Sequence, residues 1–400
     1  MSLLDRFIRY VKIDTMSSEE GIMTPSTKKQ FVLAKLLVKE LKELGLKNAK
    51  VDKYAVVTAF MPSNCDSQLT IGFNSHLDTI PGFSGTNVNP KIIKKYNGKD
   101  LRIGNGLKID NKTFPFMKNF IGKTLITTDG KTVLGADDKA GITEIMEMLE
   151  FYHNHPEIKH TNIIVAFTPD EEIGGDGIKK IDLKKFNPDY AYTVDGANPN
   201  EINYECFNAA SATVIIKGLD IHPGSAKGKM INAVDIATEF NQMLPKKEKP
   251  MYTEGHQGFI HLDSLSGEVG YAKMTYIIRD HDMKKLVKKK DYLKKVTKIL
   301  NKKYGNVINL EIKDSYQNMK DNIMKDNRSI LRVQKAMKTL GIKMTSVPIR
   351  GGTDGAYLTS QGLNTPNLGT GSYNHHGPYE FACLQEMETM VKLLIEIVKE

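Results

Sequence analysis

Five motifs place carboxylates and imidazoles at predicted strand ends, and these side chains are the best suited in the sequence to do chemistry. The motifs are FNSHLDT, LGADDKAG, TPDEE, YTVDG and SYNHHGPYE, and they contain His76, Asp78, Asp137, Asp138, Glu171, Glu172, Asp195, His375 and His376. Taken singly, a strand-end aspartate is usually a cap or turn residue, and a lone histidine is usually a satisfied polar group. Five together instead predict one site, because imidazoles and carboxylates are the ligands of cations such as zinc or manganese.

Three adjacent carboxylates, Asp170, Glu171 and Glu172, come after the apolar run NIIVA, with three residues between. Two unit charges about 4 Å apart repel by roughly 4 kcal/mol at an effective dielectric near 20, so this cluster needs a positive charge nearby. The chain offers one carboxylate more than two cations need as ligands. In metal-assisted hydrolysis such a carboxylate takes a proton from the activated water. The sequence leaves open which of the two glutamates holds metal and which faces the water.

The elements that must position these residues alternate between helix and strand. Helices are predicted at 2–11, 26–45 and 140–152, and strands at 69–78, 162–167 and 190–195. This order predicts an α/β fold with a mostly parallel sheet, whose strand ends meet at one edge. We expect Ser26 to cap the second helix, loops or a small hairpin from about Pro81 to Gly122, and a hairpin turned at Asp129 and Gly130.

The pattern changes near Asn208. Strands at 211–218, 270–280 and 307–314 and helices at 232–244 and 284–303 fit a β-α-β-β-α-β-like order in which the third strand has the weakest signal. That order is typical of a compact α+β (ferredoxin-like) unit. Helices at 329–341 and 384–400 then return to the α/β pattern. The expected domains are therefore 1–207 and 318–400, as two parts of one larger domain, with 208–317 inserted.

Composition excludes several classes of protein. Four hundred residues exceed what one core usually supports, and no stretch approaches eighteen consecutive apolar residues. The first residues alternate charged and apolar types, unlike a signal peptide. The three cysteines are far apart, which predicts neither disulfides nor a thiolate site. We expect a soluble cytoplasmic protein without a membrane partner.

The net charge of +9 suggests nucleic-acid binding as an alternative function. The lysines gather between Lys284 and Lys303, where apolar residues recur at helical spacing. They are therefore expected to line the solvated face of one amphipathic helix, and no nucleic-acid motif accompanies them. We expect no nucleic-acid partner, although a non-catalytic binding protein with a basic surface stays an alternative hypothesis.

The motifs SHLDT, GADDKAG, TPDEE and YTVDG and the final HG, in this order, resemble the M20 family of dinuclear zinc peptidases and amidohydrolases. The resemblance extends over almost the whole chain through TLITTDGKTVLGADDKAG, VAFTPDEE, FNAAS, HPGSAKG, YIIRD and PIRGGTDGA, which look like the tripeptide aminopeptidases of that family. It implies release of the N-terminal residue from tripeptides by a water that two zinc ions share. The alternative is another M20-type amidohydrolase, such as a dipeptidase or an N-acyl amino acid deacylase.

The same resemblance implies a role for each matching position. Asp137 would bridge two Zn²⁺ ions, for which Mn²⁺ or Co²⁺ are substitutes, and the peptide bond after it would be cis. His76 and Asp195 would complete one metal site, and Glu172 and His376 the other. Glu171 would be the general base and Asp78 would orient His76. The choice of His376 over His375 depends only on the following Gly377.

In the family, the inserted domain serves as a lid and often as a dimer contact, so the resemblance also implies a homodimer. It suggests that His222 stabilises the oxyanion, in its own or in a partner subunit. Arg350 and Arg279 are candidates to bind a peptide carboxylate, because a guanidinium suits that group. Structural ion pairing is the alternative role for both arginines.

Overall fold

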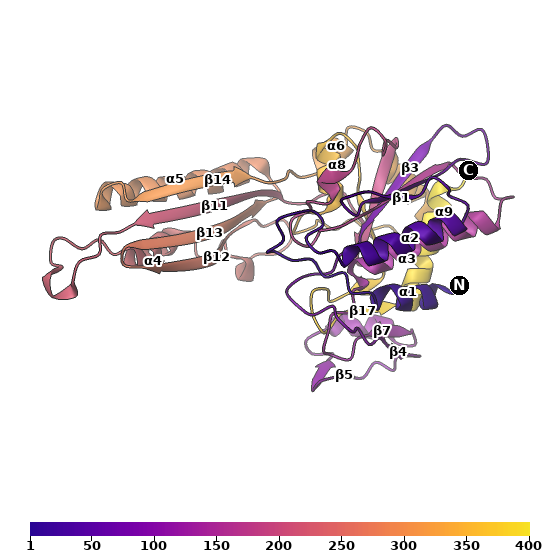
Figure 1. Ribbon diagram of the computed structural model, residues 1–400, viewed down its shortest axis with the longest axis horizontal. Helices are drawn as coiled ribbons and strands as arrows, with labels where there is room; N and C mark the ends of the chain where they lie inside the picture. The colour runs from indigo at the N-terminus through magenta and orange to yellow at the C-terminus, as the bar shows by residue number, and fades with distance from the viewer. The chain divides into compact units, whose positions relative to one another are not determined.

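The computed structural model describes all 400 residues and divides into two compact units, drawn as a ribbon in Figure 1. The larger unit contains Met1–Tyr204, Asp321–Val347 and Thr353–Glu400, and the smaller contains Glu205–Lys320 and Pro348–Gly352. The divisions lie a few residues from those expected at 207 and 317. The sequence pattern did not indicate that Pro348–Gly352 belongs to the smaller unit.

A seven-stranded sheet forms the centre of the larger unit. Its spatial order is β1 (Lys50–Val51), β2 (Val57–Met61), β8 (Asn162–Thr168), β3 (Thr70–His76), β9 (Tyr190–Gly196), β15 (Asn367–Gly369) and β10 (Ile202–Asn203). The four strands from β8 to β15 pair in parallel, and the outer strands pair antiparallel. The expected α/β fold is confirmed, and its parallel pairing is confined to the middle of the sheet.

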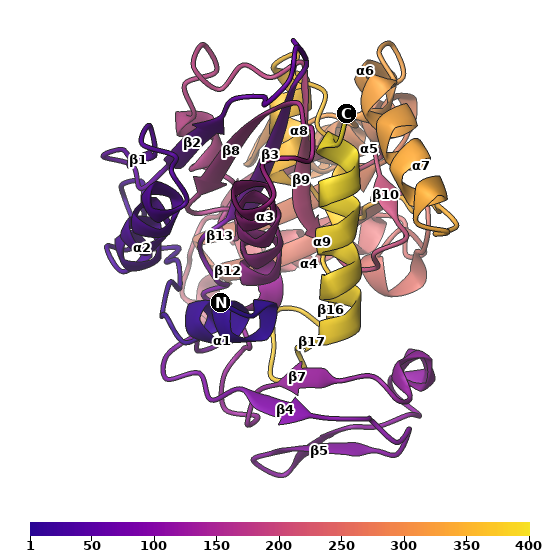
Figure 2. The same ribbon diagram turned by 90° about the vertical axis from the view of Figure 1, so that its right-hand side faces the viewer.

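Helices cover both faces of this sheet, as the alternation along β8 shows. Ile163, Val165 and Phe167 point into the main core, whereas Ile164 and Ala166 pack with Leu358 on the other side. Period-two alternation requires this, since neighbouring strand residues face opposite ways. Figure 2 shows α3 (Ala136–Asn154) beside α9 (Leu384–Val398) in front of the strands. The remaining helices of this unit are α1 (Leu3–Val11), α2 (Gln30–Glu43), α6 (Lys320–Ile323), which begins on the last residue of the smaller unit, α7 (Arg328–Thr339) and α8 (Asp354–Ser360).

A second sheet corrects one expectation. Its order is β16 (Ser372–Tyr373), β17 (Phe381–Cys383), β7 (Leu125–Thr127) and β4 (Lys91–Ile93). The hairpin expected at Asp129 and Gly130 is absent, because β7 pairs with β17 and β4 instead. The residues after the turn cannot form a strand ladder, because Val133 donates to Ser84 and Leu134 donates to the carboxylate of Glu380.

The expected small hairpin before β7 is present as β5 (Leu101–Gly104) and β6 (Leu107–Ile109). The expected cap at Ser26 is wrong, because α2 begins only at Gln30. The Ser26 hydroxyl donates to Asp170 instead, so residues 26–29 stay outside the helix.

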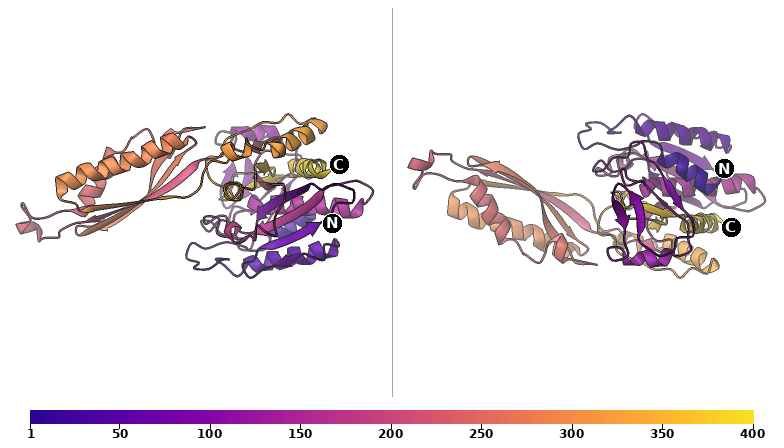
Figure 3. Two further views of the ribbon diagram at one scale, coloured as in Figure 1. Left: turned by 90° about the horizontal axis from the view of Figure 1, so that it is seen from above. Right: turned by 90° about the horizontal axis from the view of Figure 1, so that it is seen from below.

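The smaller unit has the β-α-β-β-α-β order that the sequence indicates. Its sheet runs β12 (Phe259–Glu268), β13 (Tyr271–Asp280), β11 (Asn208–Lys217) and β14 (Ile308–Asp314), with every pairing antiparallel. Helices α4 (Ala233–Met243) and α5 (Met283–Tyr304) lie on one side of it, as Figure 3 shows. Strand β12 had no range of its own in the sequence pattern, and most of its residues are exposed.

The lysine-rich helix α5 is amphipathic, as its spacing predicted. Leu286, Leu293, Val296 and Leu300 are buried, while most of the lysines between them face solvent. Asp282 caps the helix start, and Gly305, in the left-handed conformation, ends it. No helix in either unit combines the length and apolar character that crossing a bilayer requires.

Candidate metal centre

The candidate site lies in the larger unit, at the carboxyl ends of neighbouring parallel strands. Strand β3 ends at His76, β8 is followed directly by the acidic turn, and Asp195 lies near the end of β9. Asp137 opens α3 with non-helical backbone angles, and its peptide bond to Asp138 is cis. The expected convergence at one sheet edge therefore occurs.

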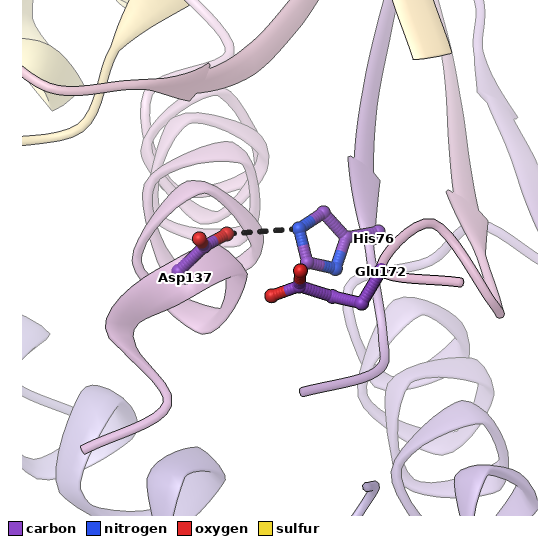
Figure 4. A group of neighbouring side chains, drawn as sticks. All are labelled: His76, Asp137 and Glu172. Atoms are coloured by element: carbon purple, nitrogen blue, oxygen red, sulfur yellow. Dashed lines mark hydrogen bonds and ion pairs between the residues drawn. The ribbon is translucent and has the colours of Figure 1, made fainter. Parts of the chain in front are cut away.

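The Asp137 carboxylate lies between three imidazoles. Its Oδ1 is 2.9 Å from His76 Nε2, and its Oδ2 is 3.2 Å from His376 Nε2 and 3.4 Å from His375 Nδ1. Figure 4 shows the contact between Asp137 and His76. The two oxygens of one carboxylate thus face opposite halves of the site. That arrangement suits a ligand shared by two cations.

A second carboxylate accompanies each half. His76 Nε2 is 3.6 Å from Asp195 Oδ1, and His376 Nε2 is 3.0 Å from Glu172 Oε2. Potential ligand atoms also gather within 4.8 Å of one another in two overlapping groups, His76 with Asp137 and Glu172, and His76 with Asp138 and Asp195. The structure therefore brings together all five residues expected to be metal ligands.

Asp78 organises the neighbouring turn and imidazole. Its carboxylate accepts hydrogen bonds from the backbone N–H groups of Glu171, at 3.0 Å, and Glu172, at 3.2 Å. Nδ1 of His76 lies 3.1 Å from the Asp78 carbonyl oxygen and 3.4 Å from Oδ1. Asp78 therefore fixes both the orientation of His76 and the position of the two glutamates.

The electrostatics of this site call for added positive charge. Burial raises the pKa of Glu172 to about 7 and raises the pKa of Glu171 and Asp195 as well. The Asp137 side chain is only 11% exposed, yet the imidazoles of His375, His376 and His76 hold its pKa well below the usual range. The basic side chains nearest to these carboxylates are all histidines, which are charged only when protonated, and none is a lysine or an arginine. Oxygen and imidazole donors with surplus buried negative charge fit divalent cations.

Asp170 has a different role from the two glutamates beside it. Its carboxylate accepts hydrogen bonds from the Ser26 N–H (2.7 Å), the Ser26 hydroxyl (2.6 Å) and Gln30 Nε2 (2.7 Å). The residue is 1% exposed and has a positive φ of 59°. Asp170 therefore anchors the start of α2, and only two of the three adjacent carboxylates face the site.

Three further acids support the site and were not assigned from sequence. Glu380 accepts hydrogen bonds from the N–H groups of Leu134, Gly135 and Asp137, so it holds the loop that opens α3. Asp354 is buried and accepts from the Thr168 hydroxyl at the end of β8. Asp138 accepts from the His76 N–H. Each of these three acids lies within one of the sequence motifs. A motif alone, however, does not show which of its acids points into the site.

The other predicted site residues belong to the smaller unit. His222 is exposed, and its Nδ1 accepts from the Gly224 N–H. Arg350 donates from both terminal nitrogens to the Gly255, Gln257 and Thr253 carbonyls and to the Thr253 hydroxyl. These four contacts use all four terminal N–H groups of the guanidinium, so only Nε–H is left.

Arg279 lies in β13 and donates to the carbonyls of Ala210 and Ile278. Its guanidinium also lies over the Tyr316 ring, 5.4 Å from the centroid. These contacts are within the smaller unit, and no carboxylate forms an ion pair with either arginine. The alternative role of structural ion pairing therefore has no support at Arg279 or Arg350.

Parallel strands whose ends gather acids and imidazoles form a site of the kind that suits metal-dependent hydrolysis. Residues 128–400 match the model of the family "Peptidase family M20/M25/M40". The chain is 50% identical to the peptidase T of Caldanaerobacter subterraneus over 99% of this chain and 98% of that protein. It is 48% identical to the peptidase T of Clostridium perfringens over the same shares. The chain therefore belongs to the M20/M25/M40 family of peptidases and, within it, to the peptidase T proteins.

Solved structures agree on the fold. An aminopeptidase PepT from Bacillus cereus matches with a TM-score of 0.78 and 22% identity, over 99% of this chain and 97% of that one. A tripeptidase from Staphylococcus aureus matches with a TM-score of 0.76 and 22% identity, over 99% and 96%. The family and the fold together make this chain a peptide-bond hydrolase.

Proposed function

We propose that this protein is a metal-dependent aminopeptidase that releases the N-terminal residue of tripeptides. The arrangement of Asp137 between imidazoles of both halves of the site carries the proposal. The substrate class follows from the peptidase T relatives, which align with nearly the whole chain. Two divalent cations, zinc first among them, would supply the Lewis acidity that activates water and polarises the scissile carbonyl.

Five residues would hold these cations. His76 and Asp195 would serve one, Glu172 and His376 the other, and Asp137 both. His76, Asp195 and Glu172 are at most about one tenth exposed, whereas His376 is 49% exposed. The half of the site that contains His376 is therefore the more open one, and we expect it to release its metal first.

Glu171 would be the general base. Its N–H is fixed by Asp78, while its carboxylate makes no hydrogen bond or ion pair and so can take up a proton. Burial raises its pKa above that of an exposed glutamate, and a more basic carboxylate is a better proton acceptor. The same carboxyl group would then return the proton to the leaving amine.

The smaller unit would supply the remaining groups and act as a lid and dimer contact. His222 is exposed and so available to donate to the oxyanion. Arg350 would need to release part of its present contacts to bind a peptide carboxylate, whereas Arg279 has terminal N–H groups to spare. The three unpaired cysteines agree with a cytoplasmic location.

The proposal is tested with purified protein that has been stripped with a chelator and reloaded with zinc, manganese or cobalt. We expect metal-dependent cleavage of a free tripeptide, with weaker cleavage of a dipeptide and none of the N-acetylated tripeptide. Cleavage of the acetylated peptide alone would instead indicate a deacylase of the same family. Absence of any hydrolysis after reloading would refute the proposal.

A further inference from the structure

A chain of short hydrogen bonds lies behind His375. The Thr370 hydroxyl donates to the Gly196 carbonyl at 2.7 Å and lies 2.7 Å from the Ser372 hydroxyl. The Ser372 hydroxyl in turn lies 2.8 Å from His375 Nε2. Thr370 and Ser372 are each 1% exposed, so solvent does not compete for these contacts.

The direction of each hydrogen bond follows from counting hydrogens. A carbonyl oxygen only accepts, so the single hydrogen of the Thr370 hydroxyl is used on Gly196. Ser372 must then donate its own hydrogen to Thr370, which leaves the Ser372 oxygen as the acceptor toward the ring. His375 therefore carries a hydrogen on Nε2.

This assignment decides what the other ring nitrogen presents to the site. A neutral imidazole has one N–H, so Nδ1 of His375 presents a lone pair. That nitrogen lies 3.4 Å from Asp137 Oδ2, which is also 3.2 Å from His376 Nε2. A lone pair that faces a carboxylate oxygen is favourable only with a positive charge between them.

We propose that His375 is an additional metal ligand through Nδ1, on the same cation as His376, Glu172 and Oδ2 of Asp137. Ser372 and Thr370 are its positioning residues, since a metal-bound imidazole generally donates its other N–H to a fixed acceptor. The side chain of His375 is 25% exposed against 49% for His376, so it is the better shielded of the two. This inference depends on the divalent cations of the proposed function.

The competing arrangement makes the opposite prediction. If His375 instead carried protons on both nitrogens, it would pair with Asp137 as a cation and compete with the metal. Removal of the imidazole would then strengthen metal binding, whereas removal of a ligand weakens it. Whether metal affinity falls or rises when the imidazole is removed therefore distinguishes a metal ligand from a cation paired with Asp137.

The experiment measures zinc affinity by competition with a chelator for wild type, His375→Phe, Ser372→Ala and His153→Phe. His153 is exposed at the last turn of α3 and makes a matched control. We expect His375→Phe to weaken one zinc site roughly tenfold or more, Ser372→Ala to weaken the same site less, and His153→Phe to bind as wild type does. Without metal, the three variants and wild type should all unfold at the same midpoint.

If wild type binds zinc and His375→Phe binds it equally well or more tightly, the inference is overturned. A wild type that binds no zinc would overturn the proposed function itself. If His375→Phe does not fold, nitrogen-15 spectra of histidine-labelled wild type decide the question. We expect a hydrogen on Nε2 of His375 and a shift of Nδ1 on zinc addition, and a lasting Nδ1–H signal would refute the assignment.

Discussion

The carboxylate of Asp78 accepts a hydrogen bond from the Glu171 N–H at 3.0 Å, and the same Oδ1 lies 3.4 Å from Nδ1 of His76. One buried side chain thus positions a proposed metal ligand and the proposed base together. A change at Asp78 therefore affects both metal binding and the chemical step, although Asp78 itself need not touch a metal.

Asp78→Asn tests this coupling. The amide presents N–H groups where the Glu172 N–H needs an acceptor, so the turn and the His76 ring lose their common support. We expect zinc affinity to fall about 10- to 100-fold, measured by chelator competition. Asp66→Asn, at an exposed loop position, should leave the affinity unchanged. Equal affinity in Asp78→Asn and wild type would contradict the positioning role.

Glu171 and Glu172 should separate chemistry from metal retention. Glu171→Gln removes the proton acceptor and keeps the five proposed ligands, so kcat should fall about 10²- to 10⁴-fold with metal content intact. Glu172→Gln removes a ligand beside His376 and should lose metal during dialysis. Metal analysis with steady-state assays on one tripeptide checks both, and equal metal loss in the two variants would show that the pair is assigned wrongly.

Asp170→Asn should affect stability and leave metal binding alone. Asparagine tolerates the positive φ, but its amide group faces the donors of Ser26 and Gln30. We expect the free energy of unfolding to fall by about 1–3 kcal/mol, measured by urea denaturation. Asp176→Asn, which removes only a surface ion pair with Lys179, is the matched control. A loss of zinc affinity in Asp170→Asn would mean that Asp170 also belongs to the metal centre.

Glu144 should give the metal-free protein a measurable pH dependence. It is fully buried in α3, neither carboxylate oxygen has a hydrogen-bond partner, and burial raises its pKa well above the usual value. The folded state therefore holds this proton more tightly than the unfolded chain. Binding of this proton by the folded state stabilises the protein at low pH. That stabilisation is lost as pH rises above about 4.3, the pKa of an unperturbed glutamate.

Glu144→Met should remove the loss of stability that wild type shows as pH rises. We expect the variant to be more stable than wild type by about 1–3 kcal/mol at pH 7 in the presence of chelator, with the difference shrinking toward pH 4. Urea denaturation across this pH range measures it. Glu388→Met, at an exposed position of α9, should show no such trend. A difference that is constant with pH would rule out ionisation of Glu144 as its cause.

Local sequence determined much of this protein. The β-branched residues of the apolar run before the acidic turn favoured the buried strand that forms there, and the spacing of Leu286, Leu293 and Leu300 made α5 amphipathic. The motif residues were identifiable because their chemistry is unusual at strand ends. The order of helices and strands then set the α/β fold and its inserted α+β unit.

Only the tertiary structure decided which neighbour does what. Asp170, Glu171 and Glu172 are equivalent in a linear sequence, but Asp170 turns toward Ser26 while Glu172 faces His376. Spacing likewise did not distinguish His375 from His376, and only the tertiary structure places Ser372 beside His375. The turn at Asp129 looked like a hairpin, but Glu380, far along the chain, takes the N–H groups that a second strand would need. Side-chain direction and long-range hydrogen bonds depend on packing between distant segments, and sequence spacing alone does not contain them.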